Sequence, residues 1–152
     1  MAQYLLTWIL VADSARARIF EWSEPSAPLT EITDLTNPQG RLKEQALSSD
    51  RPGVASSAHG SNSGHPMQAS HSGHDKSESV FAGQIDATLV AALDAGRYKQ
   101  LMLFAAPHFL GSLRSQLTPR VAKTVVESNP LDLTREDVSA IKSRLPALKA
   151  VL

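Results

Sequence analysis

The stretch WILVADSARARIFEW, residues 8–22, decides the fold of this chain. Residues 8–12 form a short apolar run rich in β-branched and aromatic side chains, which is typical of a strand buried on both faces. Residues 13–15 interrupt the run, and residues 16–22 then alternate between two faces, as in a second strand returning from a tight turn. A helix capped by Asp13 is the alternative, but the apolar residues do not recur at helical spacing. The stretch therefore predicts a β-hairpin.

The rest of the chain adds one strand to this hairpin and then alternates helices with strands. Phe81, Ile85 and Leu89 recur at helical spacing, and residues 101–106 are wholly apolar, as in a central strand. The expected strands are 29–35, 101–106 and 121–127, and Thr118-Pro119 either starts a short turn of helix or leads directly into the last of these strands. The expected helices run from Asp75 or Ser77 to Gly96, from 108 to 117 and from a Thr134 cap to 145. This order predicts one α/β domain over residues 1–152, in which an antiparallel meander followed by α-β-α-β-α forms a mixed five-stranded sheet with helices on its faces.

Residues 48–79 differ in composition from the rest of the chain. They are dominated by Ser, Gly and His and offer few apolar side chains for burial. Such a segment cannot offset the entropy of ordering by burying apolar surface, so a flexible loop is expected here. Loops of this length inside a compact domain are usually functional or disordered.

The overall composition excludes several classes of protein. The chain has 152 residues, no Cys and equal numbers of basic and acidic residues, so it is neither a disulfide scaffold nor a thiol enzyme. No apolar run approaches the roughly 18 residues of a membrane span, and the N-terminus lacks the positive region of a signal peptide. A cytoplasmic protein is expected, without a cofactor and without a DNA-specific motif.

The charged residues of the first hairpin are the first candidate site. Asp13 follows a buried strand, while Arg16 and Arg18 share a face and have the planar forks that bind phosphate or carboxylate. The structural alternative is that Asp13 caps its own turn and the arginines form ion pairs on the sheet surface. Two further candidates begin the loop, where Asp50 and Arg51 latch it to the body or present Arg51 to a partner, and Arg41 joins either arrangement.

Two further patterns concern cations. His71 and His74 are spaced so that a metal can bridge them, but they lie in a Ser-Gly segment without visible supporting residues, so no native metal site is expected. Between Asp94 and Glu127 there is no acidic residue, and five basic residues fall in this window: Arg97, Lys99, Arg114, Arg120 and Lys123. If they share a face they can contact RNA phosphates, and otherwise they are separate solvated positions.

The order of these motifs resembles a known family. WILVADSARARIF, NPQGRL, LSSDRPG, a His-Gly-rich loop and AGRYKQLMLFAAPHFLGSLRSQL are similar to the bacterial host-attachment proteins, over nearly the whole chain. A more distant similarity is to the central domain of archaeal and eukaryotic translation release factors. In those factors a loop carries a Gly-Gly-Gln tripeptide that helps water attack peptidyl-tRNA, and this sequence has no such tripeptide. Peptidyl-tRNA hydrolysis is therefore not transferred to any residue here.

Two functional hypotheses follow. The first is a cytoplasmic binding module for RNA, the ribosome or a protein partner, needed indirectly for attachment to the host. The second is a hydrolase of ester or phosphate substrates that uses Asp13 with loop residues. The sequence contains no nucleophile elbow or other recognised catalytic motif, which favours the binding module.

Overall fold

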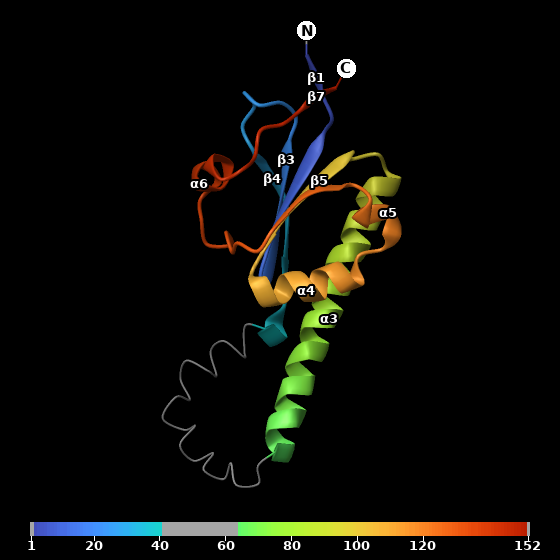
Figure 1. Cartoon of the computed structure of the whole chain (residues 1–152), viewed down its shortest axis with the longest axis vertical. Coiled ribbons are helices and arrows are strands. Elements are labelled where there is room, and N and C mark those ends of the chain that lie inside the picture. The colour runs from blue at the N-terminus through green and yellow to red at the C-terminus, as the bar shows by residue number, and fades with distance from the viewer. Residues whose placement is uncertain (1, 41–63, 152) are drawn as a thin grey trace.

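The computed structural model describes residues 2–40 and 64–151. The strands are β1 (Gln3–Tyr4), β2 (Thr7–Ala12), β3 (Arg16–Trp22), β4 (Thr30–Thr36), β5 (Gln100–Ala105), β6 (Val125–Asn129) and β7 (Ala150–Val151). The longer helices are α3 (Gly64–Asp94) and α4 (Pro107–Gln116), and the shorter ones are α5 (Pro119–Ala122) and α6 (Val138–Ser143). Figure 1 shows these elements as one mixed α/β body.

The main sheet has five strands in the order β4-β3-β2-β5-β6. β2 is central, with β3 antiparallel on one side and β5 parallel on the other, so that Leu10 lies opposite both Ile19 and Leu103. β4 continues the antiparallel meander and β6 continues the parallel half. The hairpin and the mixed five-stranded sheet expected from the sequence are thus confirmed.

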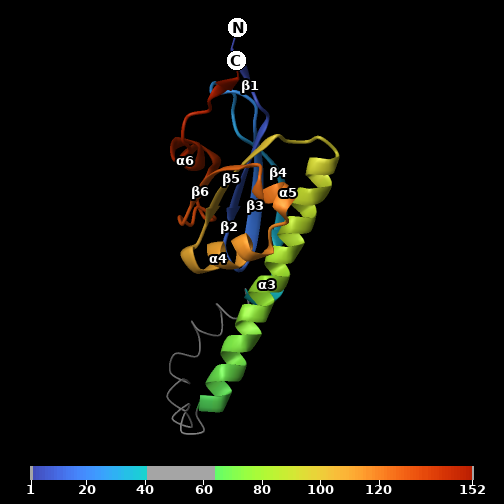
Figure 2. The same ribbon diagram turned by 45° about the vertical axis from the view of Figure 1, so that its right-hand side comes forward.

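Two hydrophobic cores cover the two faces of this sheet. Alternate residues of β2 serve each core: Trp8 and Leu10 pack with α3, α4 and α5, whereas Ile9 and Val11 pack with α6 and the segment before it. Figures 1 and 2 show α3 crossing one face and α6 lying on the other. This arrangement explains why every residue of β2 is buried.

The first helix begins much earlier than expected. Residues 64–79 belong to α3, so this part of the expected flexible loop is helical, and residues 48–63 lie outside the described residues. Phe81, Ile85 and Leu89 anchor α3 on the sheet, and extending an existing helix costs far less than nucleating one. Figure 2 shows the N-terminal part of α3 extending beyond the sheet.

The C-terminal third contains three smaller corrections. Of the two readings of Thr118-Pro119, the short helix is confirmed as α5, and the strand expected over 121–127 is Val125–Asn129. Helix α6 begins after Asp137, whose carboxylate accepts a hydrogen bond from the Ala140 N–H, so Thr134 is not its cap. β1 and β7, which the sequence did not indicate, pair to form a second small sheet.

Candidate functional site

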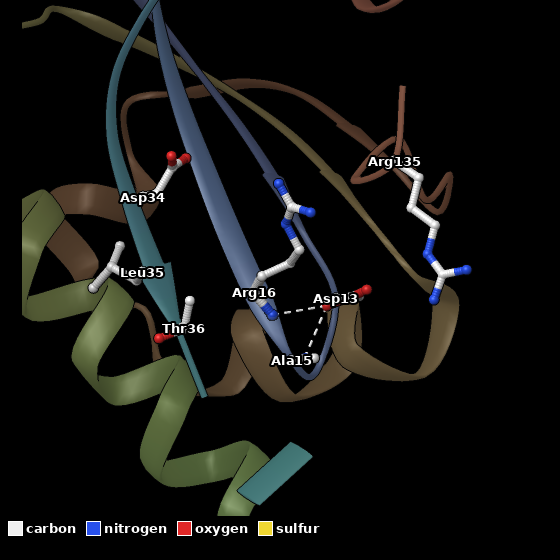
Figure 3. A pocket seen from close by; sticks show the side chains of 7 residues that line it. All are labelled: Asp13, Ala15, Arg16, Asp34, Leu35, Thr36 and Arg135. Carbon is white, nitrogen blue, oxygen red and sulfur yellow. Dashed lines mark hydrogen bonds between the residues drawn. The ribbon is translucent and has the colours of Figure 1, made fainter. Parts of the chain in front are cut away.

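The turn between β2 and β3 is built around the Asp13 carboxylate. Asp13 Oδ1 accepts hydrogen bonds from the backbone N–H groups of Ala15 and Arg16, both at 2.8 Å (Figure 3). Asp13 Oδ2 accepts a hydrogen bond of 3.2 Å from the Thr134 hydroxyl, and Asp13 is only 8% exposed. These bonds match the alternative in which Asp13 caps its own turn, and they also attach the turn to the chain after β6.

Arg18 is a structural residue that joins three parts of the chain. Its Nε and Nη2 donate to the two carboxylate oxygens of Glu31 at 2.9 and 3.0 Å. Its Nη1 donates to the carbonyls of Thr134 and Glu136 at 3.1 and 2.7 Å. The hydrogen bond to Glu31 raises the pKa of Arg18 and lowers the pKa of Glu31 to about 2. Arg18 is thus engaged within the protein and does not line a cavity with Arg16.

A hollow of about 390 Å³ lies beside the Asp13 turn. Its lining consists of Asp13, Ala15, Arg16, Asp34, Leu35, Thr36 and Arg135. Figure 3 shows Asp13 between the side chains of Arg16 and Arg135, with Asp34 on the strand beyond Arg16. Within residues 2–40 and 64–151, neither Arg16 nor Arg135 forms an ion pair or a side-chain hydrogen bond. Sequence reasoning missed Arg135, because only the long-range contacts of residues 134 and 136 bring it to the hairpin.

The same end of the sheet is tied to α3 and α4. Asn37 Nδ2 donates to the Ser14 carbonyl at 2.8 Å and to Ser77 Oγ at 3.2 Å. His108 Nε2, at the start of α4, lies 3.0 Å from Glu78 Oε2, and the Glu78 side chain is only 3% exposed. Asn37 thus connects the turn between β2 and β3 to α3, and the contact between His108 and Glu78 connects α3 to α4.

The predicted basic residues divide into two groups. Arg97, Lys99, Arg120 and Lys123, which we call the basic edge, lie in the chain segments that lead into β5 and β6. These two parallel strands begin side by side, since the Leu101 N–H donates to the Thr124 carbonyl at 2.9 Å. Arg114 is separate: it lies on α4 and its Nη2 donates to Ser128 Oγ at 2.7 Å, near the other end of β6.

Inside the basic edge the side chains differ in their contacts. Arg120 forms an ion pair with Asp94, and both side chains are more than half exposed. The Arg97 guanidinium lies 6.0 Å from the centroid of the Trp8 ring, which stacks on Tyr98. All four basic side chains are exposed. The basic edge therefore presents several positive charges to solvent with one carboxylate beside them.

The remaining candidates are not brought together by the structure. Arg41, Asp50 and Arg51 lie outside the described residues. His71 and His74 fall within α3, but their side chains are also outside the described part. Among the residues that the structure describes, no three His, Asp or Glu side chains are grouped to hold a metal ion. The expected absence of a metal site stays a prediction.

Sequence comparison provides the remaining information. A family model described as "Protein required for attachment to host cells" matches residues 8–145 and agrees with the resemblance read from the motifs. No curated protein matches the chain. In residues 2–40 and 64–151, no helix has both the length and the apolar character needed to cross a bilayer.

Proposed function

Since the family model covers most of its length, the chain belongs to the host-attachment family, and we propose that it acts there as a binding module for RNA phosphates, on free RNA or on the ribosome. The observation that supports this proposal is the basic edge. Four cationic residues lie in the short connections that precede two adjacent parallel strands, so the sheet brings them to one edge. A fixed set of exposed cations suits a phosphate backbone, whose charges are regularly spaced.

The chemistry of the basic edge favours contacts to phosphate over contacts to bases. Trp8 and Tyr98 stack on each other inside the core and are 4% and 0% exposed, so they do not offer a platform for bases. Lysine and arginine contacts to phosphate carry no sequence information by themselves. We therefore expect binding that depends strongly on salt and only weakly on RNA sequence.

The test is to titrate ribosomes and a structured RNA with the purified protein at several salt concentrations. Each phosphate contact contributes about 0.7–0.9 to the slope of log affinity against log salt. The double variant Lys99→Ala/Lys123→Ala should weaken binding and reduce the slope by about 1–2. Arg114→Ala is the matched control, because Arg114 is exposed and basic but lies on α4, at Ser128.

Unchanged affinity and slope in the double variant would contradict the proposal. Association with a ribosomal protein but not with RNA would favour the protein-partner alternative. The proposed relation to the release-factor central domain supports a ribosomal partner, and it rests on the shared order of strands and helices. A cytoplasmic location and an indirect effect on host attachment belong to the same proposal.

The hydrolase hypothesis receives no comparable support. Both Asp13 oxygens accept hydrogen bonds from the protein, which suits a structural cap better than a general base. Turnover of ester, phosphate or aminoacyl substrates that disappears in Asp13→Asn, with the fold intact, would revive this hypothesis.

A further inference from the structure

The hollow beside Asp13 is chemically separate from the basic edge. It lies at the carboxyl end of β2, beside the start of β3 and the end of β4, whereas the basic edge lies at the amino ends of β5 and β6. We propose that this hollow binds the phosphate group of a small phosphorylated molecule through Arg16 and Arg135. The inference concerns a second site and does not depend on RNA binding at the basic edge.

The hollow lies near the point where the connections of the sheet diverge. From β2 the chain runs outward to β3 and β4 on one side, and from β5 it runs through α4 to β6 on the other side. In open sheets with parallel strands, ligands bind outside the carboxyl ends of the strands where the connections diverge in this way. Asp13 directly follows β2, and the hollow extends from it along the ends of β3 and β4, on the antiparallel side of the divergence.

The charged groups that line the hollow differ in whether the protein already provides them with bonding partners. The guanidinium groups of Arg16 and Arg135 have no hydrogen-bond or ion-pair partner in the part of the chain that the structure describes. By contrast, the Asp13 carboxylate is already bonded to two backbone N–H groups and the Thr134 hydroxyl. Arg16 interacts electrostatically with Glu31 and Asp34, but neither arginine forms an ion pair with a described carboxylate, so both forks can bind the oxygens of a phosphate group.

The hollow also has further polar groups in its lining and the size of a small-molecule site. Thr36 adds an exposed hydroxyl to the lining. Asp34 adds a second carboxylate, beside that of Asp13. Asp34 has a raised pKa because of burial and its hydrogen bond to Glu31, and its charge opposes that of a bound anion. The volume of about 390 Å³ is within the range of small-molecule sites and larger than a phosphate ion needs.

The test is calorimetric titration of the full chain with inorganic phosphate, ribose 5-phosphate, adenosine 5′-monophosphate and adenosine. We expect the phosphorylated probes to bind with dissociation constants of about 1 mM or below and adenosine not to bind. Arg16→Ala and Arg135→Ala should each weaken binding about tenfold or more, as expected for the loss of a charged hydrogen-bonding partner. Asp34→Asn should strengthen binding, because it removes the opposing charge at nearly constant volume.

The controls separate this site from the basic edge and from adventitious binding. Lys99→Ala/Lys123→Ala should bind phosphate as the wild type does, even where it loses RNA. Equal binding of phosphate alone and of the two organic phosphates would mean that the site reads only the phosphate group, which still supports the proposal. The absence of binding by all three phosphate probes, equal binding of malonate, or affinities unchanged in both arginine variants would overturn it.

Discussion

The two ends of the central sheet carry similar numbers of charged residues and use them in opposite ways. At the carboxyl end, the side chains of Asp13, Arg18 and Asn37 form hydrogen bonds within the protein. Arg16 and Arg135 form none with described residues and line the hollow. At the amino end, the basic edge projects from short connections and Arg120 alone of its members has an ion-pair partner among the described residues. A polar residue near a strand end therefore indicates a binding site only if its side chain is not already hydrogen-bonded within the protein.

The largest expected effect is at Arg18. Arg18→Ala leaves Glu31 without its partner and the carbonyls of Thr134 and Glu136 without their donor. We expect a loss of about 4 kcal/mol in the free energy of unfolding, measured by urea denaturation. Arg16 lies two residues away on the same strand, and Arg16→Ala should change the free energy of unfolding by less than about 0.5 kcal/mol. Equal losses in the two variants would contradict the distinction between Arg18, which is bonded within the protein, and Arg16, which is not.

Glycines at the two ends should fail for different reasons. A Cβ on Gly40 would lie 2.2 Å from the Ser14 carbonyl oxygen, so Gly40→Ala requires a backbone shift and should cost about 3 kcal/mol of unfolding free energy. Gly96, at the amino end, has a φ of 71° and open space around it, so Gly96→Ala should cost about 1 kcal/mol. Gly96→Asn should recover part of that loss, because Asn tolerates this conformation, whereas Gly40→Asn should not be better than Gly40→Ala.

Glu31, the partner of Arg18, and Tyr98, at the amino end, should respond to opposite extremes of pH. The pKa of Glu31 falls from 4.5 to about 2 on folding, so its stabilisation is complete above 4.5 and is lost as the pH falls towards 2. Burial raises the pKa of Tyr98 from 10.0 to about 12, so its contribution is complete below 10 and is lost as the pH rises towards 12.

Two variants separate the loss of stability in acid from the loss in alkali. The difference in unfolding free energy between the wild type and Glu31→Gln should be about 2 kcal/mol at neutral pH and should shrink in acid. For Tyr98→Phe the difference should shrink in alkali instead. A Tyr98→Phe difference that changes in acid would contradict this assignment.

The smallest expected effect is at Arg97. Arg97→Ala removes the contact with the Trp8 ring and should lower the unfolding free energy by about 0.5 kcal/mol. Lys99→Ala is the control, because Lys99 is exposed at the same edge and has no aromatic contact with the described part of the chain. An equal effect of the two variants would mean that the Trp8 contact adds nothing to stability.

The elements that the sequence predicted well are those specified by local periodicity. The apolar run of residues 8–12 and the helical spacing of Phe81, Ile85 and Leu89 are properties of neighbours in the chain. The start of α3 was placed too late because Ser and Gly dominate residues 64–79 and mask a helix that an already formed segment extends. In the main sheet and its helices the errors are therefore in the ends of elements, whereas the short strands β1 and β7 carry no local pattern and were not predicted.

The site was predicted less completely because its contacts are long-range. Asp13 and Arg16 were identified from their place after a buried strand, and they line the hollow. No local pattern distinguishes Arg18, which is buried, from Arg16, which is not, because the difference comes from Glu31 and from carbonyls more than a hundred positions away. The same separation hides Arg135 from any local reading.

This separation has a consequence for how the protein is made. The Thr134 hydroxyl that bonds Asp13 lies 121 residues further along the chain, and the Arg18 bonds to residues 134 and 136 span 116 and 118 residues. Chains grow from the N-terminus, so the hairpin emerges from the ribosome long before these partners exist. The Asp13 turn is consequently completed only after residues 134–136 have emerged, and an anion that needs Arg135 would not bind the chain before that point.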